Sequence, residues 1–412
     1  MYAKVKAILP ARQYDFRSRR GTAEALLDAE ASIIAALEDC TTRPRVAVVS
    51  FDVAKAFDTV NHRLLVDKLH QCNLPNTITM WLRSFITNRT QCVRVGRSFS
   101  TETTSTSGVP QGTVLGPILY NVATYDLQSV ELSPTSKMIC YADDLLLIKQ
   151  ISVERNELDL HNDVAAISSY FRSQGLTINA SKTNLMVVGY SETPNCLKNP
   201  LTVGGVEGTL VDTLRYLGIH FDHRISFTHN AVDVTNKCRR MIGAIASFLR
   251  RWRLPAVLAK VWLTTVRPAL TYAIALTYGP SKHNQELMEK LNRFAARLVT
   301  NNYAATYEEL LSATGWCTIK ELALQQRLNL MYDYAKGVRE PPRDWLLRIT
   351  DRRSRRISHD IQLAVPASRK WRRARARNCA LIKMTDAWNA LDGKLIEMGR
   401  NSFKSAINSG NF

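Results

Sequence analysis

Residues 137–149 read KMICYADDLLLIK, two short apolar runs on either side of the turn-like stretch YADD. Apolar runs of this length around a polar break are typical of a β-hairpin. The hairpin is expected to carry Asp143 and Asp144 at its tip. Because neighbouring side chains of a strand point to opposite faces, adjacent acids serve one site only where the backbone turns. We therefore expect Asp143 to be the main ligand of any cation there and Asp144 the weaker one.

A third acid follows a second strand. Residues 45–51 (RVAVVSF) form a β-branched run short enough for a buried strand, and Asp52 comes directly after it. An acid in this position can simply end a strand in a turn. Clustered carboxylates, however, repel one another unless a cation compensates, and Mg²⁺ favours oxygen ligands and substrate phosphates. These residues alone leave two readings open: turns that simply end a strand, or a site in which Asp52, Asp143 and Asp144 are catalytic and metal-binding residues for two Mg²⁺ ions, with Mn²⁺ as an alternative, in phosphoryl transfer.

The rest of the chain divides by pattern into a mixed part and a helical part. Apolar periodicity and breaker residues predict helices over residues 21–39, 64–72, 76–87 and 153–174, an edge hairpin over 91–107, and strands over 184–188 and 214–221. After about residue 230 the pattern becomes helical and basic. We expect an α+β catalytic unit followed by a helical one.

Charge and composition limit the partners. The net charge is +19, and residues 331–412 hold 18 Lys and Arg against 8 Asp and Glu. This charge fits a polyanionic partner, which would be nucleic acid or an anionic membrane face. It fits a solvated basic surface equally well, so charge alone does not decide between the two. The most apolar run, residues 268–281, has 14 residues, which is short of a membrane span. The eight cysteines stand singly, so neither a zinc site nor a disulfide framework is predicted.

Three segments resemble the palm motifs of reverse transcriptases in order and spacing: FDVAKAFD at 51–58, GVPQGTVLGP at 108–117 and YADD at 141–144. GLTINASK at 175–182 looks like the next palm motif, LRYLGI at 214–219 like the primer-grip hairpin, and QYDFR at 13–17 like a fingers motif. Residues 228–412 resemble the thumb and C-terminal region of LINE-type retrotransposons without long terminal repeats. The WNAL stretch at 388–391 and the Phe403-Lys404 pair fit that group.

The resemblance implies a right-hand polymerase fold, with partial fingers over 1–45, a palm over 46–227 made of an antiparallel sheet with packed helices, a helical thumb over 228–300 and a basic C-terminal region over 301–412. It implies an RNA-directed DNA polymerase that extends a nicked target DNA primer along the RNA of its element. The expected partners are an RNA template, a DNA primer or target DNA and deoxynucleoside triphosphates, with no membrane. The expected location is inside the cell, in the nucleus at the site of integration.

By the same resemblance, four residues would contact the incoming nucleotide. Arg17 would bind triphosphate oxygens, since its guanidinium pairs with phosphate bidentately. Phe57 would lie under the sugar and exclude a 2′-hydroxyl. Gln111 would hydrogen-bond the nucleotide from a Gly/Pro loop. Lys182 would meet the pyrophosphate or protonate it.

Two further regions would contact nucleic acid. Tyr216, Leu217 and Gly218 would support the primer end. The segment 348–377 holds 11 Lys and Arg against two Asp, and it would neutralise the backbone of a template–primer duplex.

The match is imperfect in the fingers. The chain reaches Arg17 almost at once, so most of the fingers and the endonuclease that usually precedes such polymerases are expected to be missing. Asp15 stands where the family has glycine, and Gly21 where it has serine. The alternative is therefore a truncated, catalytically weak or inactive nucleic-acid-binding remnant. An RNA-templated RNA polymerase is a third reading, against which Phe57 argues. Template and target specificity and the oligomeric state are left open.

Overall fold

The computed structural model describes residues 12–38, 45–151, 154–189, 197, 199–249, 254–342, 363 and 377–410. The chain folds into two compact units. The first comprises residues 1–25 and 40–212, and the second comprises residues 26–39 and 213–412. Helix α2 (Thr22–Glu38) contributes most of its length to the second unit.

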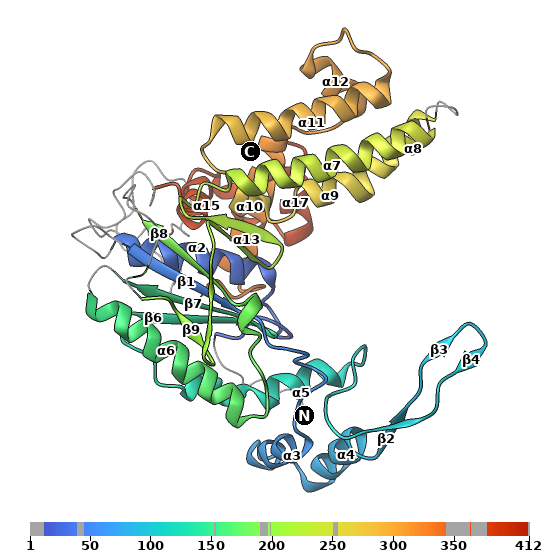
Figure 1. Ribbon diagram of the computed structural model, residues 1–412. Coiled ribbons are helices and arrows are strands. Elements are labelled where there is room, and N and C mark those ends of the chain that lie inside the picture. Colours follow the sequence, from blue (N-terminus) through green and yellow to red (C-terminus); the bar gives the residue numbers. More distant parts are fainter. Residues whose placement is uncertain are drawn as a thin grey trace. The chain divides into compact units, whose positions relative to one another are not determined.

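The first unit is built on a five-stranded sheet whose order is β11-β8-β1-β7-β6 (Figure 1). The strands are β1 (Arg45–Phe51), β6 (Ser136–Tyr141), β7 (Asp144–Gln150), β8 (Asn184–Gly189) and β11 (Thr209–Leu210). Central β1 pairs antiparallel with both neighbours, so that Val48 lies opposite Ile148 and Met186. The short β11 runs parallel to β8, so the predicted antiparallel sheet holds except at this edge.

One face of this sheet is covered by helices of the same unit. Ala47, Val49 and Phe51 alternate onto that face and share a core with Val164 and Ile167 of α6. The other helical segments of the unit are α3 (His62–Gln71), α4 (Asn76–Ile86), α5 (Leu115–Ala123), η1 (Tyr125–Ser129), α6 (Glu154–Ser173) and η2 (Ala180–Lys182). A small ladder of β9 (Thr202–Val203) and β10 (Val206–Glu207) contacts α6 and η2.

A two-stranded arm, residues 89–105, leaves the first unit after α4 (Figure 1). At its base β2 (Arg89–Gln91) pairs antiparallel with β5 (Thr103–Ser105). At its tip β3 (Arg94–Val95) pairs with β4 (Ser98–Phe99) around Gly96, whose φ of +62° suits glycine. We call this segment the hairpin arm. The hairpin predicted over residues 91–107 is confirmed, but it forms two separate two-stranded ladders and not an edge of the five-stranded sheet.

The second unit is mainly helical. It begins with the hairpin β12 (Thr213–Tyr216) and β13 (Ile219–Asp222). Its helices are α7 (Thr228–Leu249), α8 (Pro255–Val261), the π-helical η3 (Trp262–Val266), α9 (Arg267–Leu270), α10 (Ile274–Thr277), α11 (Lys282–Thr300), α12 (Tyr307–Thr314), α13 (Ile319–Ala335), α15 (Ala380–Asn389), α16 (Gly393–Glu397) and α17 (Arg400–Asn408). α7 and α11 pack together around a core in which Trp262 stacks on Trp316 at 5.7 Å.

Aromatic rings join the end of the chain to this unit. Tyr332 of α13 stacks on Phe403 of α17 at 4.3 Å and meets Trp388 of α15 edge-on at 6.4 Å. Both Trp388 and Phe403 are fully buried. Trp388 and Leu391 of the WNAL stretch, and Phe403, which the resemblance to LINE-type elements singled out, are therefore core residues.

The structure refines one predicted strand. Residues 214–221 form two strands rather than one, because Leu217 (φ +46°) and Gly218 (φ +81°) take left-handed conformations that turn the chain. This is the hairpin that the primer-grip resemblance implied. The mixed α/β architecture is confirmed, while the boundaries of fingers, palm, thumb and C-terminal region stay predictions. Within the described residues no helix is long and apolar enough to cross a membrane.

Candidate active site

The acids lie where two antiparallel strands of the central sheet meet. Phe51, the last residue of β1, is paired with Leu145 of β7. Asp52 therefore comes next to Asp144, which begins β7 and pairs in turn with Tyr141 of β6. Asp143 lies in the tight turn between β6 and β7. Three carboxylates predicted from separate motifs are thus carried by one edge of the sheet.

The turn at the hairpin tip is held by a side chain from the N-terminal segment. Ala142 has a φ of +52°, which an alanine adopts at a cost. Gln13 satisfies the backbone of this residue on both sides. The Ala142 N–H donates to Gln13 Oε1 at 3.0 Å, and Gln13 Nε2 donates to the Ala142 carbonyl oxygen at 3.4 Å. This clamp fixes the direction in which Asp143 and Asp144 leave the sheet.

Burial and mutual repulsion act on the carboxyl groups. Burial, with the charges of Asp143, Asp52 and Asp15 adding to it, raises the pKa of Asp144 to about 6. Burial also raises the pKa of Asp143, with Asp52 adding to the effect. Because each negative charge opposes ionisation of the others, the site attracts a cation. Lys182 supplies part of that charge, with its Nζ 3.8 Å from Asp52 Oδ2.

Asp15 is a fourth acid that the sequence did not assign to this site. Gln13 forms an isolated parallel bridge with Cys140 of β6, which brings Asp15 beside the hairpin tip. Burial raises the pKa of Asp15, and the charge of Asp143 raises it further. Asn121 donates to the Asp15 carbonyl oxygen at 3.2 Å and holds the segment in place. The departure from glycine at position 15 was visible in the sequence, but its proximity to Asp143 was not.

The carboxylates fit a cation by charge and donor type but are not gathered around one point. In the part of the chain that the structure describes, no three His, Cys, Asp or Glu residues form a group that could hold a metal ion. We call the strand ends that carry Asp52, Asp143 and Asp144 the acid edge. It offers carboxylate oxygens, which are the donors that hard cations prefer. These oxygens are arranged more openly than the ligands of a closed coordination shell.

The loop after the arm lies against the turn that follows Asp52. The Val109 N–H donates to the Phe57 carbonyl oxygen at 2.7 Å, and Gln111 Nε2 donates to Asp58 Oδ1 at 2.8 Å. Gly108 has a φ of +88°, and a Cβ there would lie 2.7 Å from the Asp58 carbonyl oxygen. Only glycine allows this approach. The half-buried Phe57 ring stacks on Tyr120 with centroids 4.7 Å apart. Phe57 and Gln111 are thus brought together by contacts that their separate motifs did not reveal.

The other predicted residues lie in different parts of the structure. Arg17 is half-buried, two residues beyond Asp15. Tyr216, Leu217 and Gly218 occupy the β12–β13 turn and belong to the second unit. There Tyr272 donates its hydroxyl to the Leu217 carbonyl oxygen at 2.9 Å, and Tyr216 is buried.

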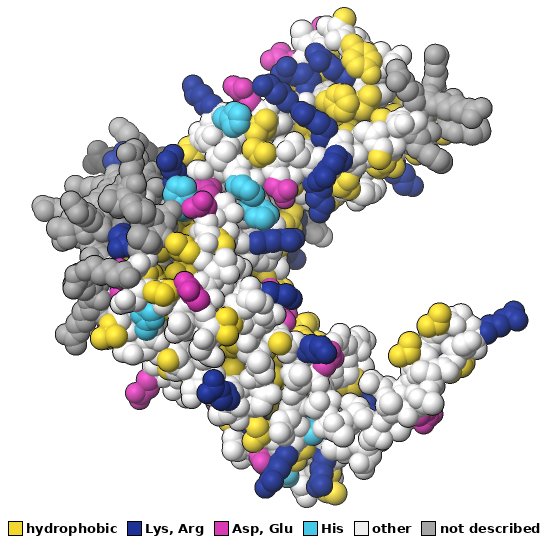
Figure 2. Space-filling view, in the orientation of Figure 1, with side chains coloured by type: hydrophobic (Ala, Val, Ile, Leu, Met, Phe, Trp, Pro, Cys, Tyr) yellow, Lys and Arg dark blue, Asp and Glu magenta, His cyan; other side chains and the backbone are white. Residues whose placement is uncertain are grey.

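Some of the basic residues of the second unit lie outside the residues that the structure describes. The segment 348–377 lies outside the described residues except for Leu363 and Arg377. On the described helices, Arg239 and Arg240 of α7 are exposed. Figure 2 shows further Lys and Arg side chains over the helices of this unit.

A mixed sheet with packed helices, which carries acids at the ends of adjacent strands, is consistent with a polymerase fold. The sequence comparison agrees, since the family model "Reverse transcriptase (RNA-dependent DNA polymerase)" matches residues 1–221. The chain belongs to this family. Members of the family use divalent metal ions.

Similar proteins place the chain among LINE-type retrotransposon sequences. It is 28% identical to "Probable RNA-directed DNA polymerase from transposon BS" of Drosophila melanogaster over 72% of this chain and 33% of that protein. It is 29% identical to "Retrovirus-related Pol polyprotein from type-1 retrotransposable element R2" of Popillia japonica over 42% of this chain and 30% of that one. The chain thus spans about a third of the length of these relatives. The resemblance to LINE-type reverse transcriptases is confirmed.

The chain is also distantly similar to solved structures. The telomerase of Candida tropicalis, in complex with a TWJ fragment of telomeric RNA, is 13% identical with a TM-score of 0.42, over 76% of this chain and 55% of that chain.

Proposed function

We propose that this chain is the polymerase part of a retrotransposon enzyme that copies RNA into DNA. The observation that carries the proposal is the strand register that sets Asp52 beside Asp144, with Asp143 in the adjoining turn. In the proposed reaction the primer 3′-oxygen forms a bond to the α-phosphorus of a deoxynucleoside triphosphate. The bond between that phosphorus and the bridging oxygen breaks, and pyrophosphate leaves.

Asp52, Asp143 and Asp144 are proposed to hold two Mg²⁺ ions, for which Mn²⁺ is an alternative. When bound, these ions would lower the pKa of the primer hydroxyl and neutralise the charge of the pyrophosphate. Burial raises the pKa of Asp143 and Asp144, and the neighbouring carboxylates add to the effect, so a cation bound beside them would favour their ionised forms. Lys182 lies beside Asp52, and its ammonium group is suited to protonating the leaving pyrophosphate.

The nucleotide is proposed to lie between the acids and the loop at 108–111. Phe57 would exclude a 2′-hydroxyl from below the sugar, and Gln111 would contact the nucleotide from the loop. Arg17 is proposed to bind the triphosphate, and Tyr216, Leu217 and Gly218 to support the primer end. Priming on nicked target DNA, and a nuclear location at the integration site, complete the proposal.

The test is primer extension on an RNA template with Mg²⁺. Asp52→Asn and Asp143→Asn remove a charge at constant shape, so each is expected to reduce extension by at least about 100-fold. Asp67→Asn is the matched control, because Asp67 is exposed on α3, and it is expected to extend at the parental rate. Asp144→Asn is expected to be damaging to a smaller degree.

Two outcomes would contradict the assignment. Parental extension by Asp52→Asn or Asp143→Asn, with an unchanged melting temperature, would remove the acids from catalysis. Template–primer binding without any extension by the parent chain would support the alternative of a nucleic-acid-binding remnant.

A further inference from the structure

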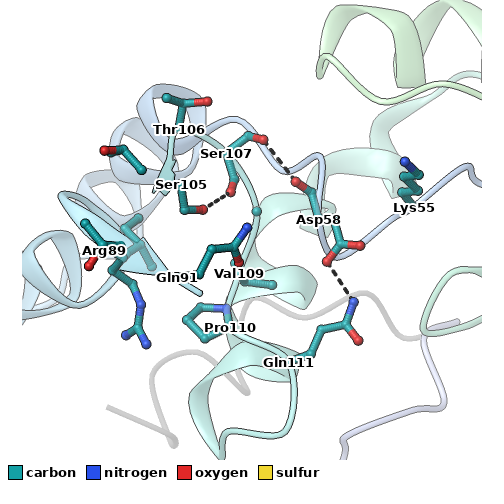
Figure 3. Close-up of a pocket in the computed structure, with 14 residues that line it drawn as sticks. Lys55, Asp58, Arg89, Gln91, Ser105, Thr106, Ser107, Val109, Pro110 and Gln111 are labelled. Carbon is teal, nitrogen blue, oxygen red and sulfur yellow. Dashed lines mark hydrogen bonds between the residues drawn. The ribbon is translucent and has the colours of Figure 1, made fainter. Parts of the chain in front are cut away.

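A pocket of about 750 Å³ lies at the base of the hairpin arm, and the acid edge does not account for it (Figure 3). Strands β2 and β5 form one wall, and the loop at 106–111 forms another. Lys55 and Asp58, from the turn after β1, lie on the remaining side. Every lining residue belongs to the first unit. We call it the arm pocket.

The lining of the arm pocket is polar, with an excess of positive charge. Lys55 and Arg89 are cations, and Thr90, Thr104 and Ser105 add hydroxyl groups. Asp58 is the single acid, and its carboxylate accepts a hydrogen bond from Gln111 at 2.8 Å. Cations, hydroxyls and amides together are the groups that bind a sugar–phosphate backbone. They do not suit an apolar ligand.

An aromatic ladder leads into the same pocket. Trp81 and Phe85 lie four residues apart on one face of α4, and Arg89 follows in β2, where its guanidinium donates to the Phe85 carbonyl oxygen at 3.2 Å. The Trp81 and Phe85 rings stack at 6.2 Å, and the Arg89 guanidinium lies 5.3 Å from the Phe85 ring centroid. Trp81 is 54% exposed although indole is costly to leave in water. Arg89 is both the end of this ladder and a wall of the pocket.

Stacked rings, one exposed and one half-buried, beside a cationic polar pocket form a typical surface for single-stranded nucleic acid. Bases stack on aromatic faces and on arginine, while cations follow the phosphates. An apolar protein partner would fit the rings alone, but it would leave Lys55 and Arg89 unpaired in its interface. A duplex would contribute phosphates but no free base faces. The combination of ladder and pocket therefore favours an unpaired strand.

We infer that the Trp81–Phe85–Arg89 ladder and the arm pocket bind the unpaired template RNA ahead of its copying. The inference rests on the proposed function for the identity of the strand. Bases of the template stack on Trp81 and Phe85, and its phosphates contact Arg89 and Lys55. Further along the arm, Arg94 and Arg97 are exposed as well.

Binding to two RNA–DNA hybrids tests the inference. One hybrid carries a single-stranded 5′ RNA overhang and the other is blunt. Affinity of the full chain for each is measured without nucleotide and with EDTA, so that polymerisation is not required. Trp81→Ala and Arg89→Gln are each expected to weaken binding of the overhanging hybrid by about 5- to 100-fold and to leave binding of the blunt hybrid unchanged. Arg89→Gln should also lower the slope of log affinity against log salt by about 0.7 for the overhang.

Arg83→Gln is the matched control. It removes the same charge from an exposed arginine of α4, two positions from Trp81 and thus on another face of that helix, whereas Arg89 lies beyond the helix end in β2. It is expected to leave both affinities unchanged. Equal losses on the two hybrids, or no loss on either with the helical circular dichroism intact, would overturn the inference. Primer extension by the same protein preparations tests the proposed function separately. A chain that does not extend primers can still bind the overhanging hybrid more tightly than the blunt one.

Discussion

At the scale of single residues, Phe57 joins two motifs that are far apart in the sequence. Its ring stacks on Tyr120 of α5, and its carbonyl oxygen accepts from the Val109 N–H of the glycine-rich loop. The ring is half-buried, so part of its surface stays open. A residue fixed on one side and exposed on the other is suited to limit the shape of a bound nucleotide.

Phe57→Val is expected to admit ribonucleotides. The shorter side chain removes atoms that would overlap a 2′-hydroxyl, so the preference for deoxynucleotides should fall by roughly ten- to several-hundred-fold. The measurement is single-nucleotide insertion with matched ribo- and deoxynucleoside triphosphates on one RNA template. Loss of the Tyr120 contact should lower stability by about 1–2 kcal/mol, which thermal melting would report.

Phe99→Val is the control for this change, because Phe99 is exposed on β4. It should preserve the parental preference. An unchanged preference in an active Phe57→Val protein would place Phe57 in the core and leave the RNA-polymerising alternative open.

Residues near the acids divide into those that sequence could predict and those that it could not. Asp52, Asp143 and Asp144 were predicted because each stands at the end of a strand that its own neighbours specify. Asp15 was not, because its position depends on the bridge between Gln13 and Cys140, which lie 127 residues apart in the numbering. Long-range pairing of this kind leaves no local pattern. The assignment of the site residues to catalysis and binding stays a prediction.

At the scale of elements, a buried acid ties the start of the chain to its end within the second unit. Glu30 of α2 is 3% exposed, and its Oε2 accepts from the Ala380 N–H at 2.9 Å and from Cys379 Sγ at 3.6 Å. Ala380 begins α15, so Glu30 satisfies a free N–H at that helix end, where the N-cap Cys379 makes no side-chain cap bond. Apolar periodicity predicted α2 correctly, but it could not indicate this contact across the chain.

Glu30 is expected to make stability depend on pH. Burial raises its pKa to about 7, despite hydrogen bonds and cations that act in the opposite direction. The pKa of Glu30 is higher in the folded chain than in the unfolded chain. Its contribution to the free energy of unfolding is therefore fully present below about pH 4 and is lost as the pH rises to about 7. The parent should lose about 3 kcal/mol of unfolding free energy from this group across that range.

Glu30→Gln should flatten this dependence, since the amide cannot ionise. The measurement is urea unfolding of both proteins between pH 4 and 8, with Glu308→Gln, an exposed acid on α12, as control. The control should show the parental pH profile. A profile for Glu30→Gln that parallels the parent would show that Glu30 ionises normally in the folded chain.

At the scale of the whole molecule, two separate cores correspond to the two units. One surrounds Ala47, Val49 and Phe51, and the other surrounds Trp262 and Trp316. The sequence predicted a mixed part followed by a helical part, because strand and helix periods differ. It did not predict that residues 26–39 group with the second unit, since α2 is apolar over much of its surface and its partners lie hundreds of residues away.

Net charge is the other property of the whole chain, and it has a measurable consequence. Lys and Arg number 55 against 36 Asp and Glu, and residues 331–412 carry 18 of the basic residues against 8 acids. Each phosphate contact releases condensed counterions, so affinity falls as salt rises.

If the basic C-terminal segment contacts nucleic acid, changing Arg372, Arg373, Arg375 and Arg377 together to Gln should lower the slope of log affinity against log salt by about 3. The same four residues changed to Lys keep the charge and should keep the slope. Filter binding of a template–primer hybrid across a series of salt concentrations measures both variants, and circular dichroism checks that each remains folded. A slope for the Gln variant equal to the parental one would mean that these four arginines face solvent and that other parts of the chain, such as the arm pocket, supply the phosphate contacts.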